Sequence, residues 1–289
     1  MQGTDLAKEG RAWRLLVDTP AGGAYNMAVD EAILLSHARE EVPPTLRLYQ
    51  WNPPAVSAGF SQDILKKIDL EQCRELGIDV VRRPTGGRAV LHDKEITYSV
   101  TISLSLLPGS ILETYRFISR GLVEAVNQLG LRAEVEDRPE KSRNPGSAAC
   151  FDSPSWYEIE VSGRKLVGSA QTRQKGVLLQ HGSVLLELDT ARMQQVLSAP
   201  NEKVRQRIAS ALEERATAVN PELIRMGKEP VQPDAVEKAL IEGFSRGLGI
   251  TLTPSALTEK ERILAEHLVK TKYSAPNWNF YRKEVGQHV

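Results

Sequence analysis

The sequence lacks the features of a disulfide-rich secreted scaffold and of a membrane protein. It holds only two cysteines, Cys73 and Cys150, in 289 residues, which excludes a fold built on a disulfide framework. No apolar run approaches the length of about 18 residues that a membrane span needs. Residues 1–14 contain no apolar core typical of a signal peptide. We therefore expect a cytoplasmic protein with reduced thiols and no membrane partner.

An excess of charge and a metal-ligand pattern are also lacking. Lys plus Arg and Asp plus Glu each number 37, so the formal net charge is zero. A general nucleic-acid binder would need a basic excess to neutralise phosphates, and we expect no nucleic-acid partner. The His, Cys, Asp and Glu residues do not follow metal-ligand spacing. We assign no metal and no cofactor.

Helical and strand patterns mix along the chain without strict alternation, and a hydrophobic fraction of 41% can supply a core. We expect an α+β fold with a mixed β-sheet core flanked by helices. Residues 1–289 are expected to form a single, monomeric catalytic domain on which a mostly helical portion, 190–289, packs. Strands are predicted at 45–51, 55–59, from 80, at 89–104, 156–168, 177–188 and 250–253, and helices at 24–40, 69–76, 111–129 and 257–270.

Two of these segments have a predicted solvent-facing side. Helix 24–40 is expected to be amphipathic, with Met27 buried and with Asp30 and Glu31 on the polar face. Residues 45–51 alternate as a half-buried strand does.

The first motif that could carry chemistry is a glycine-rich turn after a strand. Residues 82–88 read RRPTGGR, and His92-Asp93 follows. Two glycines let backbone N–H groups approach a ligand closely, and the arginines suit an anionic or carbonyl-bearing ligand. The alternative is a tight turn with a solvated basic flank. The turn is not a Walker A loop, because no Gly-Lys-Ser/Thr follows.

The second candidate is Cys150, which lies in a polar loop over residues 137–155. A thiol there can be reached by substrate, and a neighbouring cation would lower its pKa from about 8.5. The alternative is an inert, buried cysteine, which the small residues 147–149 disfavour because they offer little packing. Cys73 contrasts with it, because it shares helical spacing with Leu70 and Leu76 and is expected to lie in the core.

Two further candidates follow a predicted β-hairpin turn at residues 162–163. Lys165 could stabilise negative charge on a ligand carbonyl, and the alternative is an exposed hairpin lysine. His181, within residues 180–183 (QHGS), could act as a general base. The alternative for His181 is a hydrogen-bonded structural histidine.

Taken in order, these motifs resemble the lipoate–protein ligase and octanoyltransferase superfamily, which shares its fold with biotin–protein ligases. Most of the chain is covered by the resemblance. Residues 26–31 resemble the first helix of the superfamily, and 83–87 with 92–93 resemble its lipoyl-binding signature. Residues 163–171 with 180–183 resemble its lysine region, and Lys272-Tyr273 with Trp278 resembles its closing segment.

Two departures from the ATP-dependent ligases indicate the cysteine-dependent octanoyltransferase branch, the type found in Gram-positive bacteria. Ligases usually carry a third signature glycine, where this chain has Arg88, and they have no catalytic cysteine, where it has Cys150. The resemblance implies octanoyl-acyl carrier protein as the donor. It implies a lipoyl domain, commonly the glycine cleavage H protein, as the acceptor. No ATP is needed, because the donor is already a thioester.

The resemblance also implies the residue roles. Cys150 is expected to carry the octanoyl group as a thioester, and Lys165 to polarise the thioester carbonyl. The group that deprotonates the acceptor lysine is left open. The residues expected to shape or line the substrate pocket are Arg83, Thr85, Gly86, Gly87, His92, Gly168, Ser169, Ala170 and His181.

Four alternative functions are distinguished by their biochemistry. An amidotransferase would move octanoyl between lipoyl domains, so donor preference separates it. ATP-dependent lipoate ligation would survive the loss of Cys150. A non-catalytic docking protein would bind its partners without turnover. A cysteine hydrolase using Cys150 and His181 is disfavoured by the superfamily resemblance.

Overall fold

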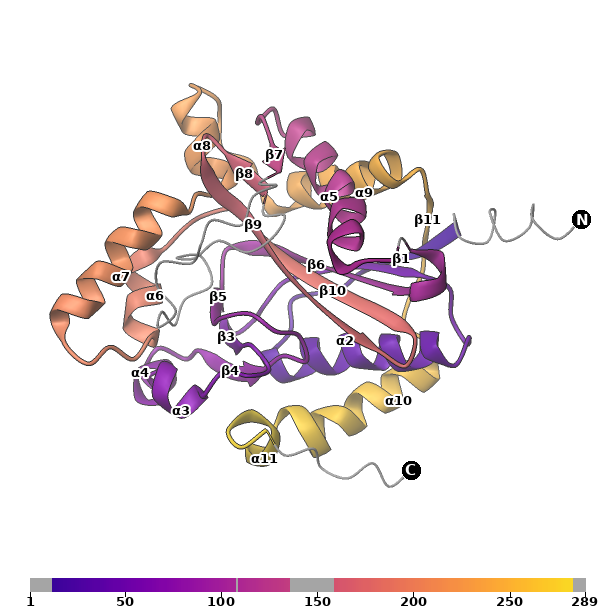
Figure 1. Ribbon diagram of the computed structural model, residues 1–289, viewed down its shortest axis with the longest axis horizontal. Helices are drawn as coiled ribbons and strands as arrows, with labels where there is room; N and C mark the ends of the chain where they lie inside the picture. The colour runs from indigo at the N-terminus through magenta and orange to yellow at the C-terminus, as the bar shows by residue number, and fades with distance from the viewer. Residues whose placement is uncertain (1–11, 108, 136–158, 283–289) are drawn as a thin grey trace, which may run out of the picture.

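The computed structural model describes residues 12–107, 109–135 and 159–282, and an eight-stranded mixed sheet forms the centre of this part (Figure 1). In spatial order its strands are β11 (Thr251–Pro254), β1 (Ala12–Val17), β2 (Thr45–Tyr49), β6 (Glu95–Ser103), β10 (Val177–Leu185), β9 (Arg164–Gln174), β8 (Ile159–Val161) and β7 (Glu134–Val135). A second, small sheet contains β4 (Asp79–Arg82), β3 (Ala55–Ala58) and β5 (Val90–His92). The expected α+β class with a mixed sheet is confirmed.

Helices cover both faces of the large sheet (Figure 1). On one face α5 (Ile111–Gln128) packs against α9 (Pro233–Leu248), and on the other lie α2 (Gly23–Ala38) and α10 (Glu259–Leu268). The alternation of β6 assigns the faces. Ile96 and Tyr98 belong to the core beneath α5 and α9, whereas Ser99 bonds to α2. The polar side of β6 therefore faces α2.

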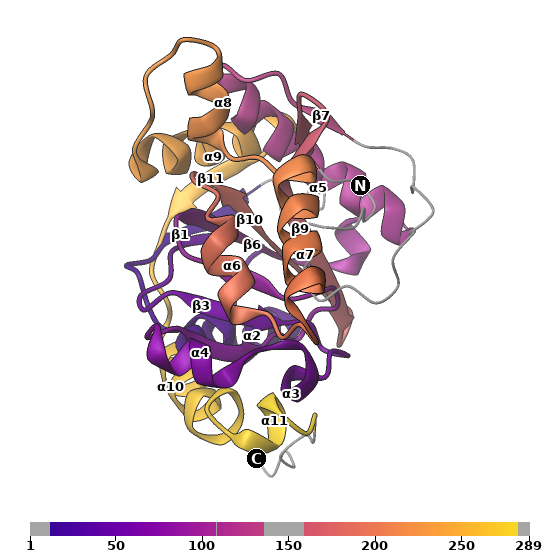
Figure 2. The ribbon, with the colours of Figure 1, turned by 90° about the vertical axis from the view of Figure 1, so that its left-hand side faces the viewer.

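The remaining helices surround the small sheet and the ends of the molecule (Figure 2). One hydrophobic cluster contains side chains of β3 and of four of these helices: α3 (Ile64–Lys67), α4 (Leu70–Glu75), α6 (Thr190–Val196) and α7 (Glu202–Arg215). Cys73 is buried in this cluster, which confirms its predicted core position. The other elements are η1 (Leu104–Leu106), α8 (Val219–Arg225), the π-helical η3 (Val269–Tyr273) and α11 (Pro276–Asn279).

Local chemistry explains why several elements begin and turn where the sequence predicts. Asp69 caps α4 by accepting a hydrogen bond from the Gln72 backbone N–H. Ser162 and Gly163 join β8 to β9 with φ angles of 54° and 71°, as a two-residue hairpin turn requires. β10 ends at Leu185, three residues before the predicted strand end.

The predicted solvent-facing sides of α2 and β2 are wrong. Asp30 and Glu31 are buried, and every residue of β2, including Arg47, is buried as well. The reason is mutual neutralisation. Arg47 Nη1 bonds to Asp30 Oδ1 at 2.8 Å, and Lys272 Nζ lies 2.8 Å from both Glu31 carboxylate oxygens. Charged side chains that find such partners can occupy an interior position.

Arg82, at the end of β4, connects the closing segment to the loop that follows β3. This buried guanidinium donates to the carbonyls of Gly59, Phe60, Gln62, Trp278 and Asn279. Burial, with a smaller contribution from Arg282, lowers the pKa of Arg82 to about 10. The strand that precedes the glycine-rich turn is thus held by the C-terminal residues.

Candidate active site

A cavity of about 380 Å³ lies between α2, the glycine-rich turn and strands β6, β9 and β10. Its lining includes the exposed Gly86 and Gly87 and the buried Met27 and Trp51. Its volume is within the range of small-molecule pockets, about 300–1,000 Å³. The structure brings eight of the nine predicted pocket residues to its wall: Arg83, Gly86, Gly87, His92, Gly168, Ser169, Ala170 and His181.

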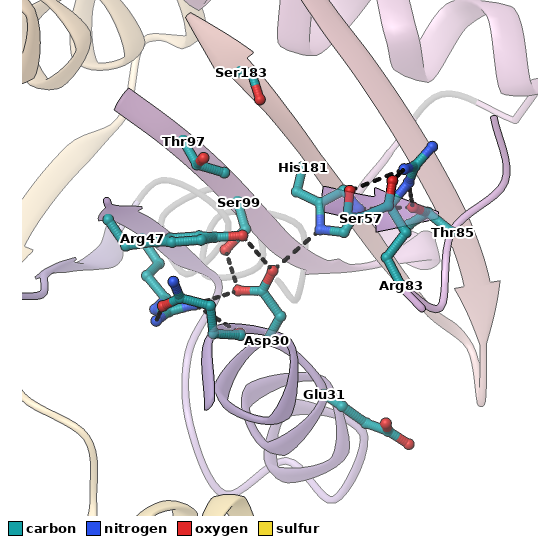
Figure 3. Close-up of polar contacts among 12 residues, drawn as sticks. Asp30, Glu31, Arg47, Ser57, Arg83, Thr85, Thr97, Ser99, His181 and Ser183 are labelled. Carbon is teal, nitrogen blue, oxygen red and sulfur yellow. Dashed lines mark hydrogen bonds and ion pairs between the residues drawn. The ribbon is translucent and has the colours of Figure 1, made fainter. Parts of the chain in front are cut away.

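The ninth predicted residue, Thr85, lies behind the wall in a hydrogen-bonded chain with His181 and Asp30 (Figure 3). Thr85 Oγ1 is 2.6 Å from His181 Nε2, and His181 Nδ1 is 3.1 Å from Asp30 Oδ2. Burial lowers the pKa of His181 and so favours the neutral ring, and the Asp30 carboxylate can only accept a hydrogen bond, so the proton lies on His181 Nδ1 and Nε2 accepts from the Thr85 hydroxyl. Arg83 Nε donates to the same hydroxyl oxygen at 3.2 Å.

A second chain of the same kind runs through Ser57, His92 and Glu95. Ser57 Oγ is 2.7 Å from His92 Nε2, and His92 Nδ1 is 2.8 Å from Glu95 Oε1. The His92 ring stacks on Trp51 with centroids 4.0 Å apart. Ser57 and Glu95 were not among the predicted residues, because neither lies in a recognisable motif and both pair with His92 of another strand.

Arg83 joins the two chains. Its Nη1 donates to Ser57 Oγ at 3.0 Å, and its Nη2 donates to the carbonyls of Gly86 and Arg88 at 2.7 Å each. The turn favours glycine at position 87, because its φ is 91°, and a Cβ there would also lie 2.8 Å from Arg83 Nη2. The Arg83 guanidinium, which was predicted to suit an anionic ligand, therefore bonds to protein oxygens and holds the glycine-rich turn in place.

Replacing Arg83 by lysine should loosen the glycine-rich turn. A single ammonium cannot keep the bonds that three guanidinium nitrogens make to Ser57, Thr85, Gly86 and Arg88. We expect kcat/KM for the substrate that enters this cavity to fall about 10- to 100-fold, as steady-state kinetics would measure. The same exchange at Arg74, which is exposed on α4, is the control. Full activity of Arg83→Lys would contradict this role.

Burial lowers the pKa of His181 below its ordinary value of 6.5, although the hydrogen bond to Asp30 opposes the shift. Burial lowers the pKa of His37 as well. The unfolded chain therefore binds more protons than the folded one as pH drops through about 6.5, and linkage predicts falling stability there. Urea unfolding at about pH 7.5 and 5.5 should show this loss, and His181→Asn should reduce it. An unchanged pH slope in that variant would contradict the assignment.

Comparison with known proteins places this site in a family. The model of the lipoyl protein ligase A/B catalytic domain matches residues 23–245. The chain belongs to this family. Octanoyltransferase LipM of Kyrpidia tusciae is 51% identical over 279 residues, which cover 94% of this chain and 100% of that protein. Octanoyltransferase LipM of Bacillus subtilis is 45% identical, with 93% of this chain and 98% of that protein covered.

Solved structures of lipoate–protein ligases share the fold. A bi-partite lipoate protein ligase from Thermoplasma acidophilum superposes with a TM-score of 0.79 and 31% identity, over 96% of this chain and 100% of that chain. Lipoate-protein ligase A bound with ATP gives a TM-score of 0.76 and 29% identity, over 93% and 98% of the two chains. The expected lipoate ligase-like fold is therefore confirmed.

The structure describes one of the two residues predicted to carry the family's chemistry. Cys150 lies outside the described residues. Lys165 is buried in β9, opposite Glu160 of β8, and its backbone oxygen accepts a hydrogen bond from Thr217 N at 2.8 Å. It is not one of the described residues that line the cavity. Among the residues that the structure describes, no group of three His, Cys, Asp or Glu side chains could hold a metal ion. Each helix in this part of the chain is too short or too polar to span a bilayer.

Proposed function

We propose that this chain transfers an octanoyl group from acyl carrier protein to a lysine of a lipoyl domain, through a thioester on Cys150. The relatives named octanoyltransferase match nearly its whole length, and acyl transfer in lipoate biosynthesis follows from that membership. The carrier-protein donor, the glycine cleavage H protein as acceptor and the covalent route are the further content of the proposal.

The main observation that supports this proposed function is the chemistry of the cavity wall. The ionisable groups deep in the wall, Arg83, His92 and His181, are bonded to protein atoms. The buried lining of the cavity also includes the apolar side chains of Met27 and Trp51. A cavity whose internal charges are already satisfied favours an uncharged chain, because a charged ligand would lose its hydration without gaining a partner. An octanoyl chain meets this condition.

In the first step the Cys150 thiolate attacks the carbonyl carbon of the donor thioester. The bond to the carrier sulfur breaks, and the carrier leaves as a thiol after taking a proton. In the second step the neutral amine of the acceptor lysine attacks the Cys150 thioester. The carbon–sulfur bond breaks, an amide forms, the amine loses its proton and the thiolate returns. Thioester exchange is nearly balanced in energy, and amide formation drives the second step.

We assign to Lys165 the stabilisation of the negative charge that develops on the carbonyl oxygen. Lys165→Ala should slow acylation of Cys150 about 10²- to 10³-fold, the loss typical for one such donor. Rapid-quench mass measurement of the acyl-enzyme would give this rate, and Lys165→Arg should recover part of it. A thermal melt checks folding, because the side chain is buried. An unchanged acylation rate in a folded alanine variant would remove Lys165 from this role.

Intact-protein mass after mixing with octanoyl-acyl carrier protein, without ATP, tests the proposal. We expect a gain of one octanoyl group that is lost when a lipoyl domain is added, with the octanoyl mass appearing on that domain. An adduct formed only from an octanoylated lipoyl domain would indicate amidotransfer instead. Transfer of free lipoate that requires ATP would establish the ligase reaction, which the fold similarity to an ATP-bound ligase makes the second candidate.

A further inference from the structure

The start of α5 and the tip of the β9–β10 hairpin form one surface beside the cavity opening. The Leu104 N–H donates to the carbonyl of Gly176, in the hairpin turn, at 2.8 Å. Arg173 Nη2 of β9 donates to Thr114 Oγ1 of α5 at 3.0 Å. Tyr115 of α5 lines the cavity together with Gln171 of β9. The same two elements thus supply this outer surface and part of the cavity wall.

This surface exposes apolar side chains where the first turn of α5 meets solvent. Ile111 is 55% exposed and Leu112 is 37% exposed. Tyr115 follows Ile111 by four residues, or about 6 Å along the helix axis, and reaches the cavity. Neighbouring exposed apolar groups of this kind, placed at a substrate opening, are typical of protein interaction sites.

Basic side chains lie on the two elements that form this surface, although the whole chain has no net charge. Arg116 of α5 and Lys175 of the hairpin turn are exposed, and Arg88 lines the cavity. Arg173 Nε is buried and finds no partner among the described residues. The acidic side chain of Glu113 turns back to cap α5 through Ser110, and that hydrogen bond lowers the pKa of Glu113.

We propose that this surface docks the donor carrier, with the carrier's apolar helix face against Ile111 and Leu112. The basic groups would receive its acidic side chains and the phosphate of its thioester-bearing arm. This inference rests on the proposed function, which supplies a carrier-bound donor. The basic character favours the donor over the acceptor, because the acceptor brings a cationic lysine to the opening whereas the donor arm carries an obligate anion.

The test compares two donors with one acceptor domain. Octanoyl-acyl carrier protein carries both the protein and the phosphate, whereas octanoyl-pantetheine carries neither. We expect Arg116→Glu and the double variant Ile111→Ser/Leu112→Ser each to raise KM for the carrier-bound donor about tenfold. Transfer from octanoyl-pantetheine should be unchanged. Raising the salt concentration should weaken carrier use by wild type and have less effect on Arg116→Glu.

Matched exchanges on a distant helical region serve as controls. Ile263→Ser on α10 removes a side chain that is 59% exposed, and Lys270→Glu reverses an exposed charge. Neither should alter KM for the carrier. The inference is overturned if the α5 variants use the carrier as wild type does, if they lose both donors equally, or if KM for the acceptor domain rises instead. Wild type that cannot use octanoyl-acyl carrier protein at all would refute the proposed function, which is a different outcome.

Discussion

Replacing Cys150 by alanine is expected to lower octanoyl transfer by roughly 10⁴-fold or more, because the covalent route has no substitute for its nucleophile. Cys150→Ser should give nearly the same loss, since a hydroxyl at neutral pH is a far weaker nucleophile than a thiolate. Octanoylation of the lipoyl domain, followed by mass spectrometry, measures the effect. Transfer by Cys150→Ala at the wild-type rate would rule out the acyl-enzyme.

Cys73 provides the matched control for this exchange. It is buried in the hydrophobic cluster that contains side chains of β3, α3, α4, α6 and α7. Burial, with a smaller effect of Asp69, raises the pKa of Cys73 to about 11. Cys73→Ala should therefore retain transfer while losing some stability. Brief alkylation at neutral pH should modify Cys150 and leave Cys73 unmodified in the folded protein. Loss of transfer in a folded Cys73→Ala variant would show that the assay does not isolate the nucleophile.

Features that depend on neighbouring residues were predictable from the sequence. The Ser162-Gly163 turn, the Asp69 cap and the core position of Cys73 each follow from chemistry within a few residues. The glycine-rich turn was also found, because Gly86 and Gly87 follow a strand directly. The predicted pocket residues came from the family resemblance, and the structure gathers most of them around one cavity.

Features that depend on distant partners were not predictable in this way. In the sequence, Asp30 and Arg47 look like the polar positions of a surface helix and of an alternating strand. In the fold both are buried, and each neutralises the charge of the other. Glu95 has no local motif, and its role depends on His92 and on Ser183, which lies 88 residues away. A sequence pattern records hydrophobic period, whereas a buried charge is stabilised by a partner whose position only the fold determines.

Asp30 provides the sharpest test of that buried network. Its carboxylate accepts hydrogen bonds from Arg47 and Ser99 at 2.8 Å and from Tyr49 at 3.0 Å, besides the contact with His181. Burial would raise the pKa of Asp30, but the bond from His181 and the charge of Arg47 outweigh it and lower the pKa. The carboxylate is therefore ionised at neutral pH, and it is the fully buried counter-charge of Arg47.

Asp30→Ala should lower the free energy of unfolding by about 3–5 kcal/mol, because it leaves the Arg47 guanidinium buried without this partner. Asp30→Asn keeps the shape and should lose less. Asp18→Asn is the control, because Asp18 also pairs with Arg47 but is 24% exposed, so solvent compensates and the loss should stay within about 1 kcal/mol. Urea unfolding measures all three variants. If Asp30→Ala and Asp18→Asn lower the free energy of unfolding equally, burial does not determine how much the Asp30–Arg47 pair contributes to stability. If the order holds, the Asp30 carboxylate, which the helix pattern assigned to solvent, stabilises the packing of α2 on the sheet through its buried pair with Arg47.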